Sequence, residues 1–301
     1  MQLPDFVSPE FTDLVQSLKS GMCLFVGAGV SKLAEYKLWD ELAKEMIKHF
    51  WQNRSSNEKL QKMDLSIRLL LENHASGNII HVMDYLNWLD SDFFVKIIKK
   101  IFDETQEKIA IYEKFRQLMQ LPNFIVQTNI DMGLQNHLSI QDSDIAINPT
   151  FSNAPKRINY IHGRIDNEKT WIFTRQQYNA NYLNEKSAVM EFLTNIFMQY
   201  SVLFIGYSLR DFEVLQAIAK ARLQESKMKF FLLESSYRDK HTLFQVNKSI
   251  YSLNYGIEII PYEIEEKGYE LLLEVLDAIN LHIQPANTFV PSGQSLDSVN
   301  E

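Results

Sequence analysis

The stretch Met22 to Ser31, MCLFVGAGVS, decides the fold of this chain of 301 residues. Its first five residues are apolar without polar alternation, which predicts a strand buried on both faces, as in a parallel sheet. Gly27 and Gly29 follow where the chain leaves the sheet, and without β-carbons they let backbone N–H groups come close to an anion. Ser31 can cap the next helix or hydrogen-bond a phosphate. The stretch therefore indicates a turn that binds the diphosphate of a dinucleotide.

The glycine turn matches the dinucleotide fingerprint only in part. That fingerprint has a third glycine three positions after the second, and here the position holds Lys32. A tight turn that merely joins a strand to its helix is the alternative interpretation. The diphosphate hypothesis therefore needs support from other parts of the chain.

Composition and charge describe an ordinary globular protein, with 46% hydrophobic and 23% charged residues. The net charge of −8 argues against a general nucleic-acid-binding surface. Cys23 is the single cysteine, which excludes a disulfide within the chain and a cysteine-rich zinc site. Neither a signal peptide nor an apolar run of the ~18 residues that a membrane span needs is present. We therefore expect a cytoplasmic protein without contact to membranes.

Apolar strands alternate with helices along most of the chain. A helix is predicted over residues 8–20, with Ser8 as its N-cap and Gly21 after its end. Six strands are predicted, over residues 22–26, 123–128, 157–161, 201–205, 229–234 and 257–262. This alternation predicts an α/β fold, a doubly wound, Rossmann-like and mainly parallel six-stranded sheet.

Three segments depart from the alternation. Residues 38–120 have an almost entirely helical pattern, which predicts a helical subdomain inserted between the first and second strands. The Rossmann-like domain then takes residues 1–37 and 121–284. A polar segment with two prolines, residues 139–156, predicts a long loop, and a short strand or hairpin arm is predicted over residues 170–173. Residues 285–301 predict a disordered tail.

Polar and glycine-containing segments follow the predicted strands at their carboxyl ends. After the first, Gly27 to Ser31, come Thr128, Asn129 and Asp131, then His162 and Gly163, then Gly206, Ser208 and Asp211. Because the carboxyl ends of parallel strands lie along one edge, these residues are expected to converge. Each alone has an ordinary explanation as a helix cap or loop residue. Their occurrence at four consecutive strand ends indicates one active site.

The four segments GAGVS (27–31), QTNID (127–131), IHG (161–163) and GYS (206–208) resemble, in this order, the motifs of the sirtuin superfamily. The resemblance extends over about residues 21–215. Protein-deacylating sirtuins also have a four-cysteine zinc module and a Gly-Ile-Pro-Asp-Phe-Arg loop. This chain has one cysteine, and KLAEYKLWDEL stands in place of that loop. The pattern is similar to bacterial sirtuin-like domains with a helical insertion, several of which deplete NAD in antiphage defence.

This resemblance implies a role for each motif, with NAD as the substrate and its nicotinamide–ribose bond as the bond hydrolysed. Asn129 would position water or the ribose hydroxyls, Asp131 would contact the nicotinamide amide or its ribose, and His162 would be the general base. The cofactor-binding set comprises Gly27, Ala28, Gly29 and Ser31 at the diphosphate, Gly206 and Ser208 at the adenosine half, and Thr128. No zinc or other metal is expected.

Other functions stay open at this stage. The fold could bind NAD or ADP-ribose as a regulatory or assembly module without turnover, and protein deacylation is a further alternative. Hydrolysis and cyclisation of ADP-ribose are not separable by sequence. Because a freely active NADase would poison its own cell, we expect restraint by a homo-oligomer, by the 139–156 loop or helical insertion, or by a partner. Such a partner would be a DNA-translocating ATPase or a separate sensor.

Overall fold

A parallel sheet of seven strands organises the computed structural model, which describes residues 3–150, 154–183, 187–209, 211–237, 241–264 and 268–284. The strands are β1 (Cys23–Val26), β2 (Phe124–Gln127), β3 (Ile145–Ile147), β4 (Ile158–Tyr160), β5 (Val202–Ile205), β6 (Phe230–Ser236) and β7 (Ile257–Glu263). Their order across the sheet is β3-β4-β2-β1-β5-β6-β7, and every pair is parallel. The predicted doubly wound α/β fold is confirmed.

β1 lies in the middle of this sheet, between β2 and β5. Leu24 is level with Ile125 on one side and with Leu203 on the other, and all four residues of β1 are buried. The chain builds β2, β3 and β4 on one side of β1 and then crosses to β5 on the other side. The carboxyl ends of β1 and β5 therefore form the switch point of the sheet, where ligands bind in open α/β sheets.

Two details of the strand prediction were wrong. The predicted loop 139–156 contains a short 3₁₀ turn (Asp142–Asp144) and the edge strand β3, so the sheet has seven strands and not six. Three half-buried residues inside a polar segment give too short a pattern to be recognised as a strand. Residues 170–173 form no strand: a 3₁₀ turn (Glu168–Thr170) is followed by irregular backbone. Their apolar side chains are buried in a loop, which explains the strand-like sequence.

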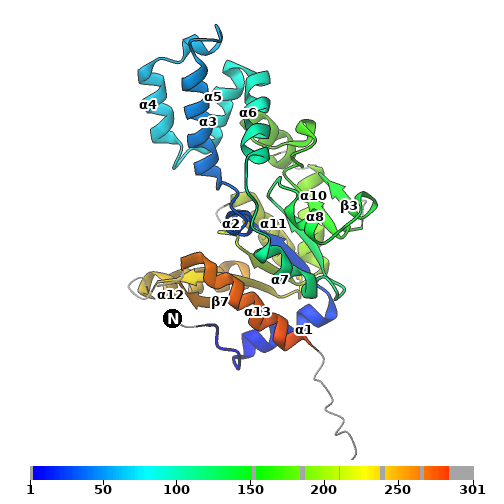
Figure 1. Cartoon of the computed structure of the whole chain (residues 1–301). Coiled ribbons are helices and arrows are strands. Elements are labelled where there is room, and N and C mark those ends of the chain that lie inside the picture. Colours follow the sequence, from blue (N-terminus) through cyan, green and yellow to red (C-terminus); the bar gives the residue numbers. More distant parts are fainter. Residues whose placement is uncertain are drawn as a thin grey trace, which may run out of the picture.

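Helices cover both faces of the sheet (Figure 1). One face packs on α1 (Pro9–Ser20), α7 (Ala110–Leu118) and α13 (Leu271–Ile283). The other face packs on α10 (Ala188–Gln199), α11 (Phe212–Leu223) and α12 (His241–Tyr255). α1 begins and ends as predicted, because the Ser8 hydroxyl accepts from the N–H of Phe11 at 3.1 Å and Gly21 has φ of 100°.

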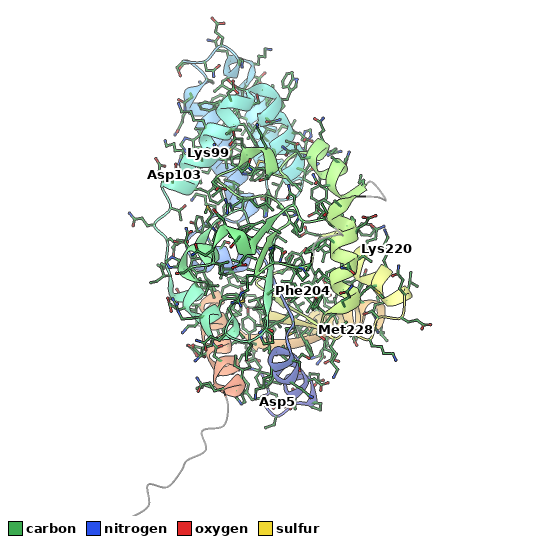
Figure 2. All side chains as sticks on the ribbon, turned by 90° about the vertical axis from the view of Figure 1, so that its right-hand side faces the viewer. Asp5, Lys99, Asp103, Phe204, Lys220 and Met228 are labelled. Atoms are coloured by element: carbon green, nitrogen blue, oxygen red, sulfur yellow. The ribbon has the colours of Figure 1, made fainter. Side chains whose placement is uncertain are left out.

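A group of helices stands above the sheet in Figure 1 and includes α3 (Trp39–Asn53), α4 (Leu65–His74), α5 (Ile79–Leu89) and α6 (Ser91–Asp103). Figure 2 shows Lys99 and Asp103 of α6 in this helical group, well away from Phe204 in the sheet. The group has its own core, to which the sheet loops contribute Ile130, Trp171 and Phe173. The helical group therefore rests on the loops that follow β2 and β4. α7, the last helix of the predicted 38–120 segment, is not part of this group. It packs with α13 on the face of the sheet that α1 also covers.

Within the described ranges, no helix combines the length and the apolar character that a membrane crossing requires. The predicted disordered tail, residues 285–301, lies outside the described residues.

Candidate active site

The glycine turn after β1 packs against the turn that follows β5. The N–H of Gly27 donates to the carbonyl of Ile205 at 3.0 Å, and the N–H of Gly29 donates to the carbonyl of Gly206 at 2.8 Å. A β-carbon on Gly27 would lie 2.6 Å from the Gly206 oxygen and 2.8 Å from Cα of Tyr207. Gly206 itself has φ of 61°, in the left-handed region that favours glycine. Close approach of two backbones therefore requires the glycines, and both N–H groups are used to join the turns.

The segment after β2 closes this turn from the other side. The side-chain amide of Asn129 donates from Nδ2 to the carbonyl of Gly27 at 2.8 Å. The Ser31 hydroxyl donates to Oδ2 of Asp131 at 2.5 Å, and the N–H of Thr128 donates to the carbonyl of Val26 at 3.1 Å. Ser31, Thr128, Asn129 and Asp131 are all buried. The first two predicted motifs therefore meet as one hydrogen-bonded unit.

Asp131 is a buried carboxyl group in this unit. Burial raises its pKa, hydrogen bonds from Ser31 and from the N–H of Gly133 oppose the rise, and the nearby charge of Glu107 adds to it. The net result is a pKa above the ordinary value for aspartate. The carboxyl group therefore holds a proton more readily than an exposed aspartate does.

His162 follows β4 and is 7% exposed. Among the described residues, its Nδ1 has no hydrogen-bond partner although it is buried. Burial lowers the pKa of the imidazole, while the Asp211 carboxylate and a hydrogen bond with the Thr128 backbone act in the opposite direction, and the net shift is downward. The ring is therefore neutral at pH 7, and its Nδ1 is unpaired within the described ranges, which is the state a general base needs.

Aromatic side chains surround the His162 ring. Its centroid lies 5.7 Å from that of Tyr182, 6.3 Å from that of Trp39 and 6.4 Å from that of Tyr178. Trp39 comes from α3 of the helical group, whereas Tyr178 ends α9 (Arg175–Tyr178) and Tyr182 lies in the π-helical turn Asn179–Leu183. The helical group therefore takes part in closing the site over His162.

Two tyrosine hydroxyls pair with acidic residues that follow β5, and neither tyrosine was assigned a role from the sequence. The hydroxyl of Tyr207 donates to Oδ2 of Asp211 at 2.5 Å, and that of Tyr178 donates to Oε2 of Glu213 at 2.9 Å. The position of Tyr207 inside the GYS motif was a usable signal, whereas nothing in the sequence singled out Tyr178. Ser208 is exposed on this turn and Ala28 is half-exposed on the turn after β1. Backbone contacts between the two turns bring these two residues to the same edge.

These contacts join the carboxyl ends of β1, β2, β4 and β5 in one place. Residues 123–260 match the family model of the SIR2-like domain. The match begins just before β2 and ends within β7, so this SIR2-like segment includes Asn129, Asp131 and His162 but not the Gly27 turn. No curated protein matches the chain. The match supports the resemblance to the sirtuin superfamily and, because SIR2-like domains use NAD, an NAD-related function in general terms.

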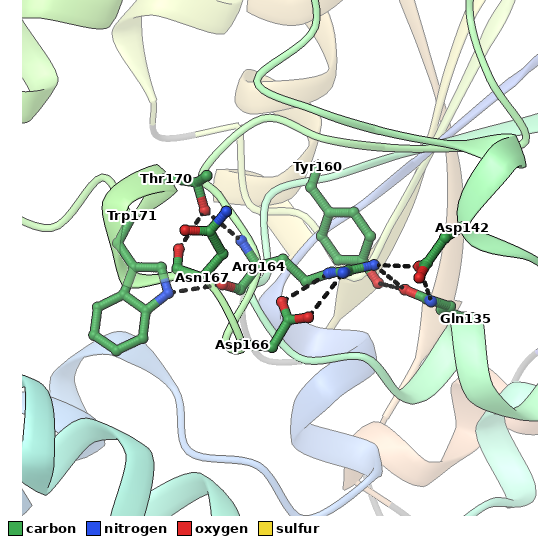
Figure 3. Close-up of polar contacts among 8 residues, drawn as sticks. All are labelled: Gln135, Asp142, Tyr160, Arg164, Asp166, Asn167, Thr170 and Trp171. Atoms are coloured by element: carbon green, nitrogen blue, oxygen red, sulfur yellow. Dashed lines mark hydrogen bonds and ion pairs between the residues drawn. The ribbon is translucent and has the colours of Figure 1, made fainter.

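Arg164 holds the loop that follows His162 in the SIR2-like segment (Figure 3). Its side chain is 12% exposed and forms ion pairs with Asp142 at 2.8 Å and Asp166 at 2.7 Å. Its Nη1 also donates to Oε1 of Gln135 in α8 (Gly133–His137) at 3.1 Å. The N–H of Ile165 donates to the carbonyl of Ile130 at 2.8 Å. The network therefore fixes the loop after β4 against the segment after β2.

The Arg164→Gln variant is expected to lower the free energy of unfolding by about 1.5 kcal/mol, because the buried side-chain oxygen of Gln135 loses its charged donor, whereas the exposed carboxylates of Asp142 and Asp166 stay hydrated. Urea denaturation measures this loss. Arg116→Gln is the matched control, since Arg116 pairs with Glu113 on an exposed helix face and such pairs contribute about 0.5 kcal/mol. Equal losses in the two variants would contradict the assignment of Arg164 as an anchor.

Two cavities lie away from His162 and Asn129. One of about 500 Å³ lies between α3 and the connection from α6 to α7, and Glu35, His49 and Lys108 are among its lining residues. The other, of about 360 Å³, lies at the amino ends of β1 and β5 beside Gly21 and Ser201. In the described parts of the chain, no cluster of three or more His, Cys, Asp or Glu is arranged to hold a metal ion.

Proposed function

We propose that this chain is an NAD⁺ glycohydrolase, which cleaves the nicotinamide–ribose bond of NAD⁺ with water to give nicotinamide, ADP-ribose and a proton. The observation that carries the proposal is the buried, neutral His162, whose Nδ1 has no hydrogen-bond partner among the residues that the structure describes. A hydrogen bond with the backbone of Thr128 links it to the segment in which Asn129 binds Gly27. Unpaired buried nitrogen atoms are rare and call for a functional explanation.

The proposed chemistry follows from the bond that breaks. Nicotinamide leaves C1′ of the ribose as a neutral molecule, and the transition state has oxocarbenium character, as in glycoside hydrolysis. Asn129 directs its Nδ2 to the Gly27 carbonyl, so its Oδ1 is the atom that can orient water or a ribose hydroxyl. Nδ1 of His162 then accepts the proton released from that water or hydroxyl.

The remaining residues are proposed to bind the dinucleotide. The diphosphate would lie against Ala28 and Gly29, the half-exposed part of the turn after β1. Gly206 and Ser208 would hold the adenosine half, and Asp131 would contact the nicotinamide amide or its ribose. Ser31 and Thr128 would support these contacts through their hydrogen bonds to Asp131 and Val26.

The biological role is proposed from the resemblance. Bacterial sirtuin-like domains with a helical insertion include NAD-depleting effectors of antiphage defence, which supports a cell-suicide role for this chain. Such an effector needs a trigger, and a DNA-translocating ATPase or a separate sensor protein would supply it. Protein deacylation is disfavoured, because the chain has a single cysteine in place of a four-cysteine zinc module.

The test is incubation of the chain with NAD⁺, with nicotinamide, ADP-ribose and cyclic ADP-ribose measured by liquid chromatography and mass spectrometry. We expect equal amounts of nicotinamide and ADP-ribose. Asn129→Ala should slow their release by on the order of 10²-fold, because the attacking oxygen is no longer oriented. Asn136→Ala, an exposed asparagine on α8, is the matched control and should leave the rate unchanged.

A second candidate function is supported by the closure of the site. Because aromatic side chains surround the His162 ring and restrict the approach of water to it, retention of NAD or ADP-ribose by a regulatory module without turnover is the second candidate. Calorimetric titration with NAD⁺ and with ADP-ribose separates the two functions. Tight binding without release of nicotinamide, with the partner proteins present as well, would favour the module and contradict the NADase.

A further inference from the structure

α12 has two opposite apolar faces. Phe244, Tyr251 and Tyr255 are half-buried and pack against the core on one face of the sheet. On the opposite side a row of four aliphatic side chains, the α12 stripe, faces solvent; its members are Leu243 (59% exposed), Val246 (49%), Ile250 (45%) and Leu253 (84%). Figure 1 shows α12 on the outside of the molecule, beside β7. Single exposed apolar residues are normal, but four in a row along one helix indicate a contact surface.

The spacing of the α12 stripe is that of a helix-pairing seam. Its members follow one another at intervals of three, four and three residues, which is the a/d pattern of paired helices. The e and g positions beside the seam are Thr242, Asn247, Ser249 and Asn254, all neutral and polar. Such flanks give neither attraction nor repulsion between two identical helices. The stripe is therefore complementary to itself.

The charge of α12 selects among possible partners. Residues 241–255 contain no acidic residue and one lysine, Lys248, whereas the whole chain has a net charge of −8. Two acidic copies can approach here without bringing carboxylates together. A single lysine does not provide the basic face that an amphipathic helix uses to bind anionic lipid. A second copy of this chain is thus the occupant that fits best.

We propose that two copies of this chain pair through their α12 stripes about a two-fold axis. The contact can extend to α11, because Arg222 lies against Gly256 and places the ends of α11 and α12 side by side. Leu223, the last residue of α11, is 85% exposed at this end. A helix of 15 residues is about 22 Å long, which is short for a standard interface. The dimer is therefore expected in the micromolar range of dissociation constants.

Analytical ultracentrifugation of the full chain over a range of concentrations tests the pairing. We expect a monomer–dimer equilibrium whose dissociation constant rises at least about tenfold in Ile250→Glu, because each dimer would then bury two unpaired carboxylates. Leu281→Glu changes a leucine on α13 that is 68% exposed, and it should leave the equilibrium unchanged. A chain that stays monomeric throughout would overturn the proposal. Equal dissociation constants for the wild-type chain and Ile250→Glu would also overturn it.

Three further variants distinguish loss of the α12 contact from a folding defect in Ile250→Glu. Leu69 on α4 is 51% exposed, so dimerisation lost in Leu69→Glu and kept in Ile250→Glu would place the contact in the helical group and overturn the proposal. Val246→Cys and Ile250→Cys, oxidised separately and mixed, should form a covalent dimer, since the native Cys23 is fully buried. Linkage of each variant to itself would show parallel helices, and linkage only in the mixture would show antiparallel helices. These readouts do not depend on NAD⁺ turnover.

Discussion

The His162→Ala variant is expected to cleave NAD⁺ about 10³-fold more slowly than the wild-type chain, which is the usual contribution of a general base. The alanine removes the imidazole Nδ1, which is the proposed proton acceptor for water or a ribose hydroxyl. Binding of NAD⁺ should change much less, because the proposed diphosphate and adenosine contacts come from the turns after β1 and β5. The loss should therefore fall on kcat, measured as release of nicotinamide at saturating NAD⁺.

The pH dependence of NAD⁺ cleavage is a second test of His162 as the general base. A general base works in its neutral form, so activity is present above its pKa and is lost as the pH falls through it. Burial lowers the pKa of His162 below the usual 6.5. The rate of the wild-type chain should therefore stay constant down to about pH 6.5 and fall only in more acidic solution. The residual rate of His162→Ala should lack this acidic decline.

The matched control is His81→Gln, which changes a half-exposed histidine on α5 in the helical group. Both its rate and its acidic decline should equal those of the wild-type chain. Normal turnover of NAD⁺ by the His162→Ala variant would remove this histidine from the reaction, and the proposed mechanism with it.

The predictable parts of the fold are those whose structure follows from a pattern in their own residues. β1 has four consecutive buried residues, and a continuous apolar run followed by glycine is a pattern that the sequence itself displays. The parallel order of the strands then made it predictable that Asn129 lies near Gly27. β3 was missed because a three-residue edge strand is defined by its neighbour β4 and not by a pattern of its own.

The surroundings of His162 were not predictable for a related reason. Trp39, Tyr178 and Tyr182 lie outside the four motifs that predicted the site. Tertiary packing brings all three to the ring, Trp39 with the helical group and the two tyrosines with the core on one face of the sheet. The structure of the glycine turn was also predictable only in part. The sequence indicated that small residues were needed there, but not that the neighbouring group is the backbone of Gly206.

Replacement of Gly27 by alanine is expected to lower the free energy of unfolding by about 3 kcal/mol, at the upper end of the cost of overpacking. The new β-carbon would meet the Gly206 oxygen at 2.6 Å and Cα and Cβ of Tyr207 at 2.8 Å. Neither partner can easily retreat, because Val26 pairs with Ile205 in the sheet and the N–H of Gly27 donates to the Ile205 carbonyl. Urea unfolding followed by circular dichroism measures the loss.

Gly77→Ala is the matched control for this change, because a β-carbon on Gly77 meets no atom within 4 Å. Its backbone is outside the left-handed region, so alanine should raise the free energy of unfolding by about 0.5 kcal/mol through a lower entropy of the unfolded chain. The two substitutions add the same methyl group and should shift stability in opposite directions. Should Gly27→Ala unfold at the same urea concentration as the wild-type chain, the close contact between the turns after β1 and β5 would not exist. The positions of Asn129 and Ser31 relative to the Gly27 turn would then be wrong as well, since Asn129 donates to the Gly27 carbonyl itself.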